Sequence, residues 1–185
     1  MRWDELFGDL EAQADALEIA ERAAEVEERT RAEIGTLRMH NRLRAAIGEQ
    51  IRARFRGDIA VSATIVQVGP DWVLFDEGAG RESLALTAAV LSVRGLGRFS
   101  AVPDSESVVA ARLTVRHALR GIARDRSATR IHLVDATVID GTIDRVGADF
   151  VEIATHGAGE LRRRHDVRDC ELLPIAAIAV IRRQV

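Results

Sequence analysis

Two segments of the sequence, TIVQVGPDWVLF at 64–75 and TIDRVGADFVEI at 142–153, align without a gap at an offset of 78 residues. Six positions carry the same residue type, and Trp72 is replaced by Phe150. A second matched pair follows at an offset of 88, LALTAAVLSVR at 84–94 and LLPIAAIAVIR at 172–182. Because the matched segments follow in the same order, the sequence predicts two tandem copies of one small domain.

Each copy reads as a helix followed by five short strands. From Ile51 onward apolar and polar residues alternate, which is typical of half-buried strands. Gly57-Asp58 and Gly69-Pro70-Asp71 provide tight turns between the strands. Five closely spaced strands favour a strongly bent antiparallel barrel over a sandwich, which needs about seven strands. Gly141 and its counterpart Ala63 are small mid-strand residues that permit such a bend.

The expected organisation is therefore mainly β with helices. The helix that heads the second copy is expected to begin after a cap at Asp104 or Ser105. Its expected buried side consists of Val108, Ala111, Val115, Ala118, Leu119 and Ile122. The predicted divisions are a long acidic amphipathic helix over 1–35, a first barrel over 36–96, a linker over 97–107 and a second barrel over 108–185.

The second copy resembles the Sm-like fold of the Sm and LSm proteins and of the bacterial host-factor RNA chaperone. The resemblance covers both copies and excludes the N-terminal helix. It lies in the order of a helix, three strands and a terminal strand pair around a one-turn bend. The positions that match the pattern in the second copy are Asp135, Gly141, Ile143, Val146, Val151 and Ile178.

The resemblance implies RNA binding and assembly by pairing of edge strands between neighbours. The RNA-binding residues of the family are not carried over, because Asp149-Phe150-Val151 and Pro174-Ile175-Ala176 stand at those positions. The two tandem copies are expected to pair with each other. Open edges would then remain at both ends of the pair, which favours a closed homo-oligomer.

Charge is divided unevenly along the chain. Residues 1–34 hold four Arg against eleven acidic residues, and the rest of the chain holds 22 Arg against 18. Residues 35–57 and 112–130 each carry six Arg and one acidic residue. Such patches attract phosphates or an acidic protein surface. The alternative is that the arginines merely replace lysines on solvent-exposed faces and bind no partner.

The N-terminal segment has one apolar stripe at helical spacing, with large side chains in its first turns. A helix of this length with so narrow an apolar stripe is not stable alone and must pack against another segment or another protein. A coiled coil, a helical hairpin with the next segment and docking on another protein each satisfy that need. The residues expected to bind a partner are Trp3, Leu6, Phe7 and Leu10.

Few residues suggest chemistry. All 26 basic residues are Arg, which excludes a lysine nucleophile or P-loop lysine, and the one cysteine excludes an intrachain disulfide and a Cys-based zinc site. The five His show no ligand spacing, although His156 and His165 flank one loop. No catalytic motif, cofactor or metal site is expected, and a cytoplasmic protein without a membrane span is the default.

Two functions remain open. The first is RNA binding through the arginines of the two heading helices, and the second is a protein–protein adaptor or assembly module that acts through the N-terminal helix and the open barrel edges. The candidate nucleic-acid-binding residues are Arg38, Arg42, Arg44, Arg116, Arg120 and Arg124.

Overall fold

The structure of the protein is a computed structural model that describes residues 3–103, 105–155 and 169–184. The chain divides into two units, residues 1–38 and residues 39–185. The first unit contains α1 (Trp3–Thr36), which continues through Gly35 and ends one residue beyond it. His156 and His165, which flank one loop in the sequence, lie outside the described residues.

The second unit begins with α2 (Met39–Ala45), and its first five strands follow without another α-helix between them. These strands are β1 (Gln50–Phe55), β2 (Ile59–Val68), β3 (Trp72–Asp76), β4 (Glu82–Leu86) and β5 (Val90–Arg94). A single 3-10 turn, η1 (Thr87–Ala89), separates β4 from β5. Alternate residues of β1 and β2 are buried, as the period of two predicts.

The second half repeats this order after two helices, α3 (Val108–Arg112) and α4 (Val115–Asp125). Its elements are β6 (Ala128–Leu133), β7 (Val138–Val146), β8 (Phe150–Thr155), β9 (Asp169–Pro174), η2 (Ile175–Ala177) and β10 (Ile178–Arg183). The single helix expected from residue 108 is therefore two helices separated at Leu113-Thr114. Ser107 caps α3 through its side chain, whereas Ser105 lies two residues before this cap and Asp104 lies outside the described residues. Val108 and Ala111, which the sequence predicts to be buried, are exposed.

The pairing registers of the two halves match position by position. Ile51 pairs with Ala63 in the first half, and Thr129 pairs with Gly141 in the second. Trp72 pairs with Leu86, as its counterpart Phe150 pairs with Pro174. The register shift in β2 after Ile65 also recurs in β7 after Ile143. These pairings confirm the offsets of 78 and 88 that the sequence predicts.

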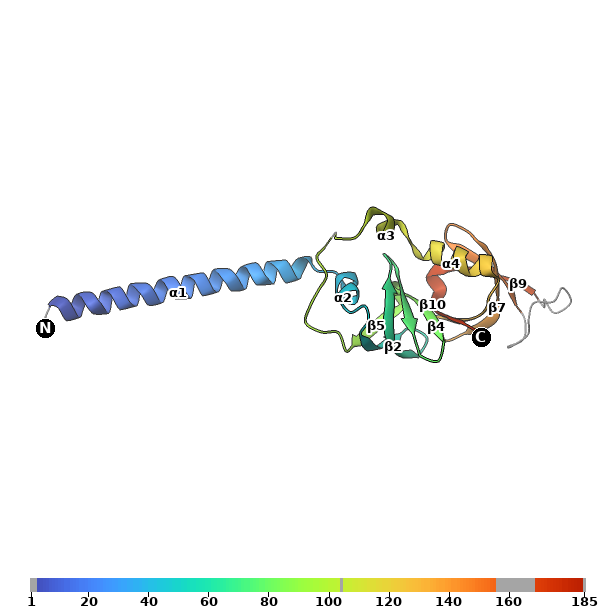
Figure 1. The fold of residues 1–185 in the computed structure, drawn as a ribbon, viewed down its shortest axis with the longest axis horizontal. Helices are drawn as coiled ribbons and strands as arrows, with labels where there is room; N and C mark the ends of the chain where they lie inside the picture. Colours follow the sequence, from blue (N-terminus) through green and yellow to red (C-terminus); the bar gives the residue numbers. More distant parts are fainter. Residues whose placement is uncertain (1–2, 104, 156–168, 185) are drawn as a thin grey trace. The chain divides into compact units, whose positions relative to one another are not determined.

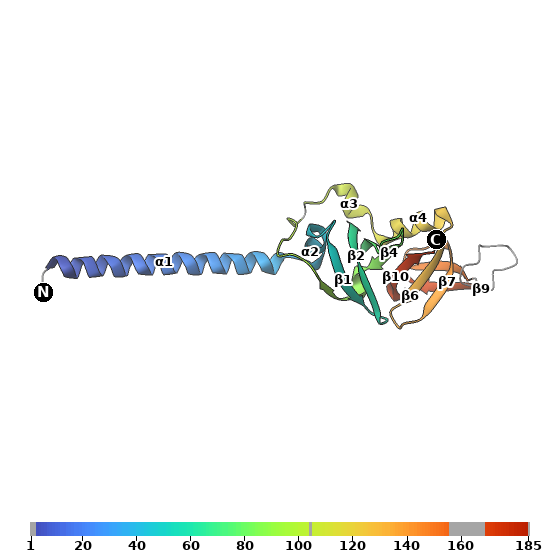
Figure 2. The same cartoon turned by 60° about the horizontal axis from the view of Figure 1, so that its bottom comes forward.

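The ten strands that the structure describes form one sheet in the order β5-β1-β2-β3-β4-β10-β6-β7-β8-β9, with antiparallel pairing throughout. The two five-stranded barrels expected from the sequence are not confirmed, whereas the expected pairing of the two copies with each other is observed. The described strands continue from one half into the other where β4 pairs with β10, and this junction lies in the middle of residues 39–185 (Figures 1 and 2).

The two hydrophobic cores interlock across this junction. Trp72, Leu84 and Leu86 of the first half belong to the core of the second half, where Leu119 of α4 also lies. Ala179 and Val180 of β10 belong to the core of the first half. Because each half completes the core of the other, residues 39–185 fold as one unit.

Candidate interaction surfaces

The junction between the halves is formed by β4 and β10. Leu84 pairs with Ile181 and Ser83 with Arg182. Leu84 is only 4% exposed, and Ser83 and Ile181 are also buried. The junction is thus a fully covered strand pair of the kind found inside a single sheet.

Arg182 adds a polar contact to the junction. Its Nε donates to Oε1 of Glu77 at 2.9 Å, and its Nη1 donates to Nε2 of His132 at 3.1 Å. His132 belongs to the second half and Glu77 to the first, so one guanidinium connects both. Burial, together with the nearby positive charges of Arg182 and Arg130, lowers the pKa of His132 below its ordinary value.

The two ends of the sheet are strands with only one strand neighbour. β5 pairs with β1 alone, and β9 pairs with β8 alone, among the strands that the structure describes. Leu91 in β5 is 59% exposed, and Leu172 in β9 is 57% exposed. An edge strand that presents large apolar residues is a site for strand addition.

The two edge strands occupy the same positions in the repeat as the two junction strands, β5 corresponding to β10 and β9 to β4. Leu172 of β9 corresponds to Leu84 of β4, and Leu91 of β5 corresponds to Ala179 of β10, which is fully buried. Arg94 likewise corresponds to Arg182. Equivalent positions of the repeat are therefore buried at the β4–β10 junction and exposed at the two ends of the sheet.

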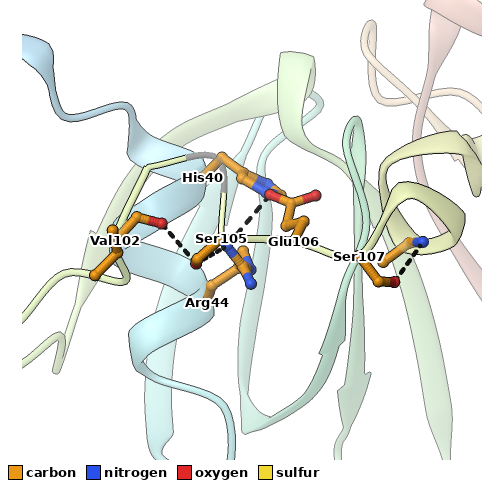
Figure 3. Close-up of polar contacts among 7 residues, drawn as sticks. His40, Arg44, Val102, Ser105, Glu106 and Ser107 are labelled. Atoms are coloured by element: carbon orange, nitrogen blue, oxygen red, sulfur yellow. Dashed lines mark hydrogen bonds and ion pairs between the residues drawn. The ribbon is translucent and has the colours of Figure 1, made fainter.

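The arginines of α2 hold the segment between the halves. Arg42 donates from Nη1 to the carbonyl oxygen of Arg98 at 2.8 Å and from Nη2 to that of Gly97 at 2.5 Å. Arg44 lies 3.4 Å from Oε1 of Glu106, and His40 contacts the same carboxylate (Figure 3). Two of the six arginines proposed for nucleic acid are thus engaged within the chain.

The same segment is also ordered by its own hydrogen bonds. Ser105 donates from Oγ to the carbonyl oxygen of Val102, and Oγ of Ser107 accepts from the backbone of Ala110 (Figure 3). The backbone of Ala101 donates to the carbonyl oxygen of Asn41 in α2 at 2.9 Å. The linker predicted over 97–107 is consequently a strap bound to α2.

Helix α4 is anchored to the first half at its N-terminus. Oδ1 of Asp71 accepts from the backbone of Val115 at 2.7 Å, and Nε1 of Trp72 donates to the carbonyl oxygen of Leu113 at 2.7 Å. A carboxylate at a helix N-terminus is favourable because of the unpaired N–H groups there. The turn before β3 thereby fixes where α4 begins.

The other face of α4 is basic. Arg116, Arg120 and Arg124 follow at intervals of four residues, and all three are exposed. Arg124 is 3.9 Å from the neighbouring Asp125, an exposed and weak pair. Arg38 is exposed as well, but it belongs to the other unit of the chain. Three of the six arginines are therefore brought together on one helix.

A cavity of about 420 Å³ lies between α4 and the sheet where the halves meet. Trp72 and Leu74 of β3, Leu84 of β4 and Ile181 of β10 line its apolar side. Gly121 lines it from α4, and no described atom lies within 4 Å of where a Cβ would be. Sequence reasoning missed this cavity because its walls come from both halves.

The apolar stripe of α1 is exposed at the positions described. Phe7 is 58% and Leu10 51% exposed, and Leu17 and Ile34 are exposed too. The side chains of Trp3 and Leu6 lie outside the described part of the chain. Pairs at i and i+4, such as Glu27–Arg31 at 3.0 Å, support the helix itself.

The described residues contain no group of three His, Cys, Asp or Glu side chains placed to hold a metal ion. Their helices also include none whose length and apolar character would suffice to cross a membrane. Neither the protein-family models nor the curated proteins with which the chain was compared match it.

Proposed function

We propose that the chain is a non-catalytic assembly module that joins copies of itself head to tail by strand pairing. The observation that carries the proposal is the junction within one chain, where β4 pairs with β10. These two strands are the repeat counterparts of the edge strands β9 and β5. The matching registers of the halves support the repeat from which the pairing between copies is derived.

The repeat gives the expected register between copies. Moving the junction by 88 residues places Arg94 of β5 opposite Glu171 of β9 in the next copy, with Val93 opposite Leu172. Arginine opposite glutamate is a favourable cross-strand pair. Leu172 would then be covered as Leu84 is covered in the junction, and each joining of two copies removes two exposed edges.

Sedimentation velocity tests this function. The wild-type chain is expected to sediment as an oligomer whose population rises with concentration, and Leu172→Arg is expected to sediment as a monomer. Val138→Arg is the matched control, because Val138 is an exposed apolar residue on β7, which has two strand neighbours. A wild-type chain that stays monomeric at 100 µM, a test concentration of roughly the scale of weak interfaces, would refute the proposal.

RNA binding is a second candidate, and the exposed arginines of α4 favour it. Binding by arginines alone would be mainly to phosphates, so affinity should fall steeply with salt. Replacing Arg116, Arg120 and Arg124 by Gln should flatten the salt slope by about one unit or less for each arginine that no longer neutralises a phosphate. Binding to mixed RNA that the triple change leaves untouched would remove this candidate.

A further inference from the structure

The cavity beside α4 and the N-terminal helix have complementary chemistry. The cavity is lined by aliphatic side chains and one indole, and its volume of about 420 Å³ is within the range of ligand sites. The helix offers exposed Phe7 and Leu10 on a single face. Neither feature is used by the strand edges.

Charge on the exposed face of α4, beside the cavity, favours an acidic partner. Arg116, Arg120 and Arg124 lie along α4 next to the residues that line the cavity, and Arg183 lines it from β10. Glu82 and Asp125 also line the cavity and oppose this charge. The positive charge therefore lies on the exposed face of α4 beside the cavity and not in its lining, which holds one arginine against two acids. Residues 1–34, in contrast, have seven more acids than arginines.

We infer that the cavity receives the first turns of α1 from a second copy of the chain, with Phe7 and Leu10 inserted and the acidic residues facing the arginines of α4. An intact helix of 34 residues keeps its two ends about 51 Å apart, which suits it to reach another molecule. Amphipathic helices bind grooves in this way through apolar anchors at i and i+3.

A labelled peptide of residues 1–20 tests the inference by fluorescence anisotropy. The receptor is the full chain carrying Leu172→Arg, so that edge pairing between receptors does not affect the readout. Saturable binding is expected, and Gly121→Leu in the receptor should weaken it at least ten-fold by filling the cavity. Gly121→Ala should have a smaller effect, and circular dichroism checks that both variants stay folded.

The peptide provides its own matched control. Phe7→Ser with Leu10→Ser should abolish binding, whereas Ala12→Ser with Ala16→Ser, on the opposite face of the helix, should preserve it. Arg116→Gln with Arg120→Gln should weaken binding and reduce its salt dependence. Equal binding to the Gly121→Leu receptor would overturn the inference, as would an absence of binding while mixed RNA binds the same receptor.

Discussion

The junction strands β4 and β10 and the edge strands β9 and β5 occupy equivalent positions in the repeat but differ in their strand neighbours. At the junction Leu84 is covered by Ile181 of the other half, whereas its counterpart Leu172 faces solvent. The residue type is identical and the register within each half is identical. The difference is that β4 has β10 as a second neighbour, whereas β9 pairs with β8 alone among the described strands. Exposure of Leu172 thus follows from the missing neighbour strand rather than from a different residue type.

The largest expected effect comes from placing a charge at the two equivalent leucines. Leu84→Arg buries an unpaired charge in the interlocked core and should destabilise the fold by about 4 kcal/mol or more. Leu172→Arg should change the free energy of unfolding of the monomer by no more than about 0.5 kcal/mol. Urea unfolding of both variants measures the contrast. Equal destabilisation would mean that the edge is not the open equivalent of the junction.

Arg182 at the junction and Arg94 at the edge occupy equivalent positions in the repeat and allow a second comparison of junction and edge. Arg182→Gln removes charge-assisted hydrogen bonds with Glu77 and His132, so a destabilisation of about 1–3 kcal/mol is expected. Arg94→Gln should leave the monomer stable and weaken self-association, because the pair with Glu171 is removed. Thermal unfolding and sedimentation measure the two effects separately. An Arg94→Gln chain that associates like wild type would contradict the proposed register.

A smaller effect is expected from pH. Because folding lowers the pKa of His132 below 6.5, the unfolded chain binds more protons between the folded-state value and 6.5. The contribution of neutral His132 to stability is present above this range and is lost as pH falls through it. His132→Gln should reduce the loss of stability between pH 7.5 and pH 5, a window set by the ordinary histidine pKa of about 6.5. An unchanged pH profile would show that His132 is not responsible.

The repeat explains why so much of the strand pairing was predictable. Turn residues and alternation are local signals, and a second copy of them confirms the first. The pairing of the two copies was expected from the resemblance, but the strands that form it were not, because nothing in Leu84 itself distinguishes it from Leu172. The break between α3 and α4 depends on Asp71 and Trp72, which lie about forty residues earlier in the sequence.

The candidate sites were predictable to a similar degree. The charge pattern identified both arginine groups, but Arg42 and Arg44 bind the strap between the halves. Only the group on α4 remains exposed as a set. A count of charges does not reveal which arginines have carbonyl or carboxylate partners in the same chain, since those partners are distant in sequence.

The most direct test of head-to-tail pairing is a cysteine cross-link in its expected register. In a Cys170→Ser background, Arg94→Cys with Glu171→Cys places the two thiols on directly opposite residues, where Cα atoms about 4.5–5.5 Å apart permit a disulfide. Covalent dimers and higher multimers are expected after mild oxidation, and far fewer for Ser92→Cys with Glu171→Cys, which is displaced by two residues. A cross-linked yield that is equal in both registers, or a product that stays monomeric, would contradict head-to-tail pairing.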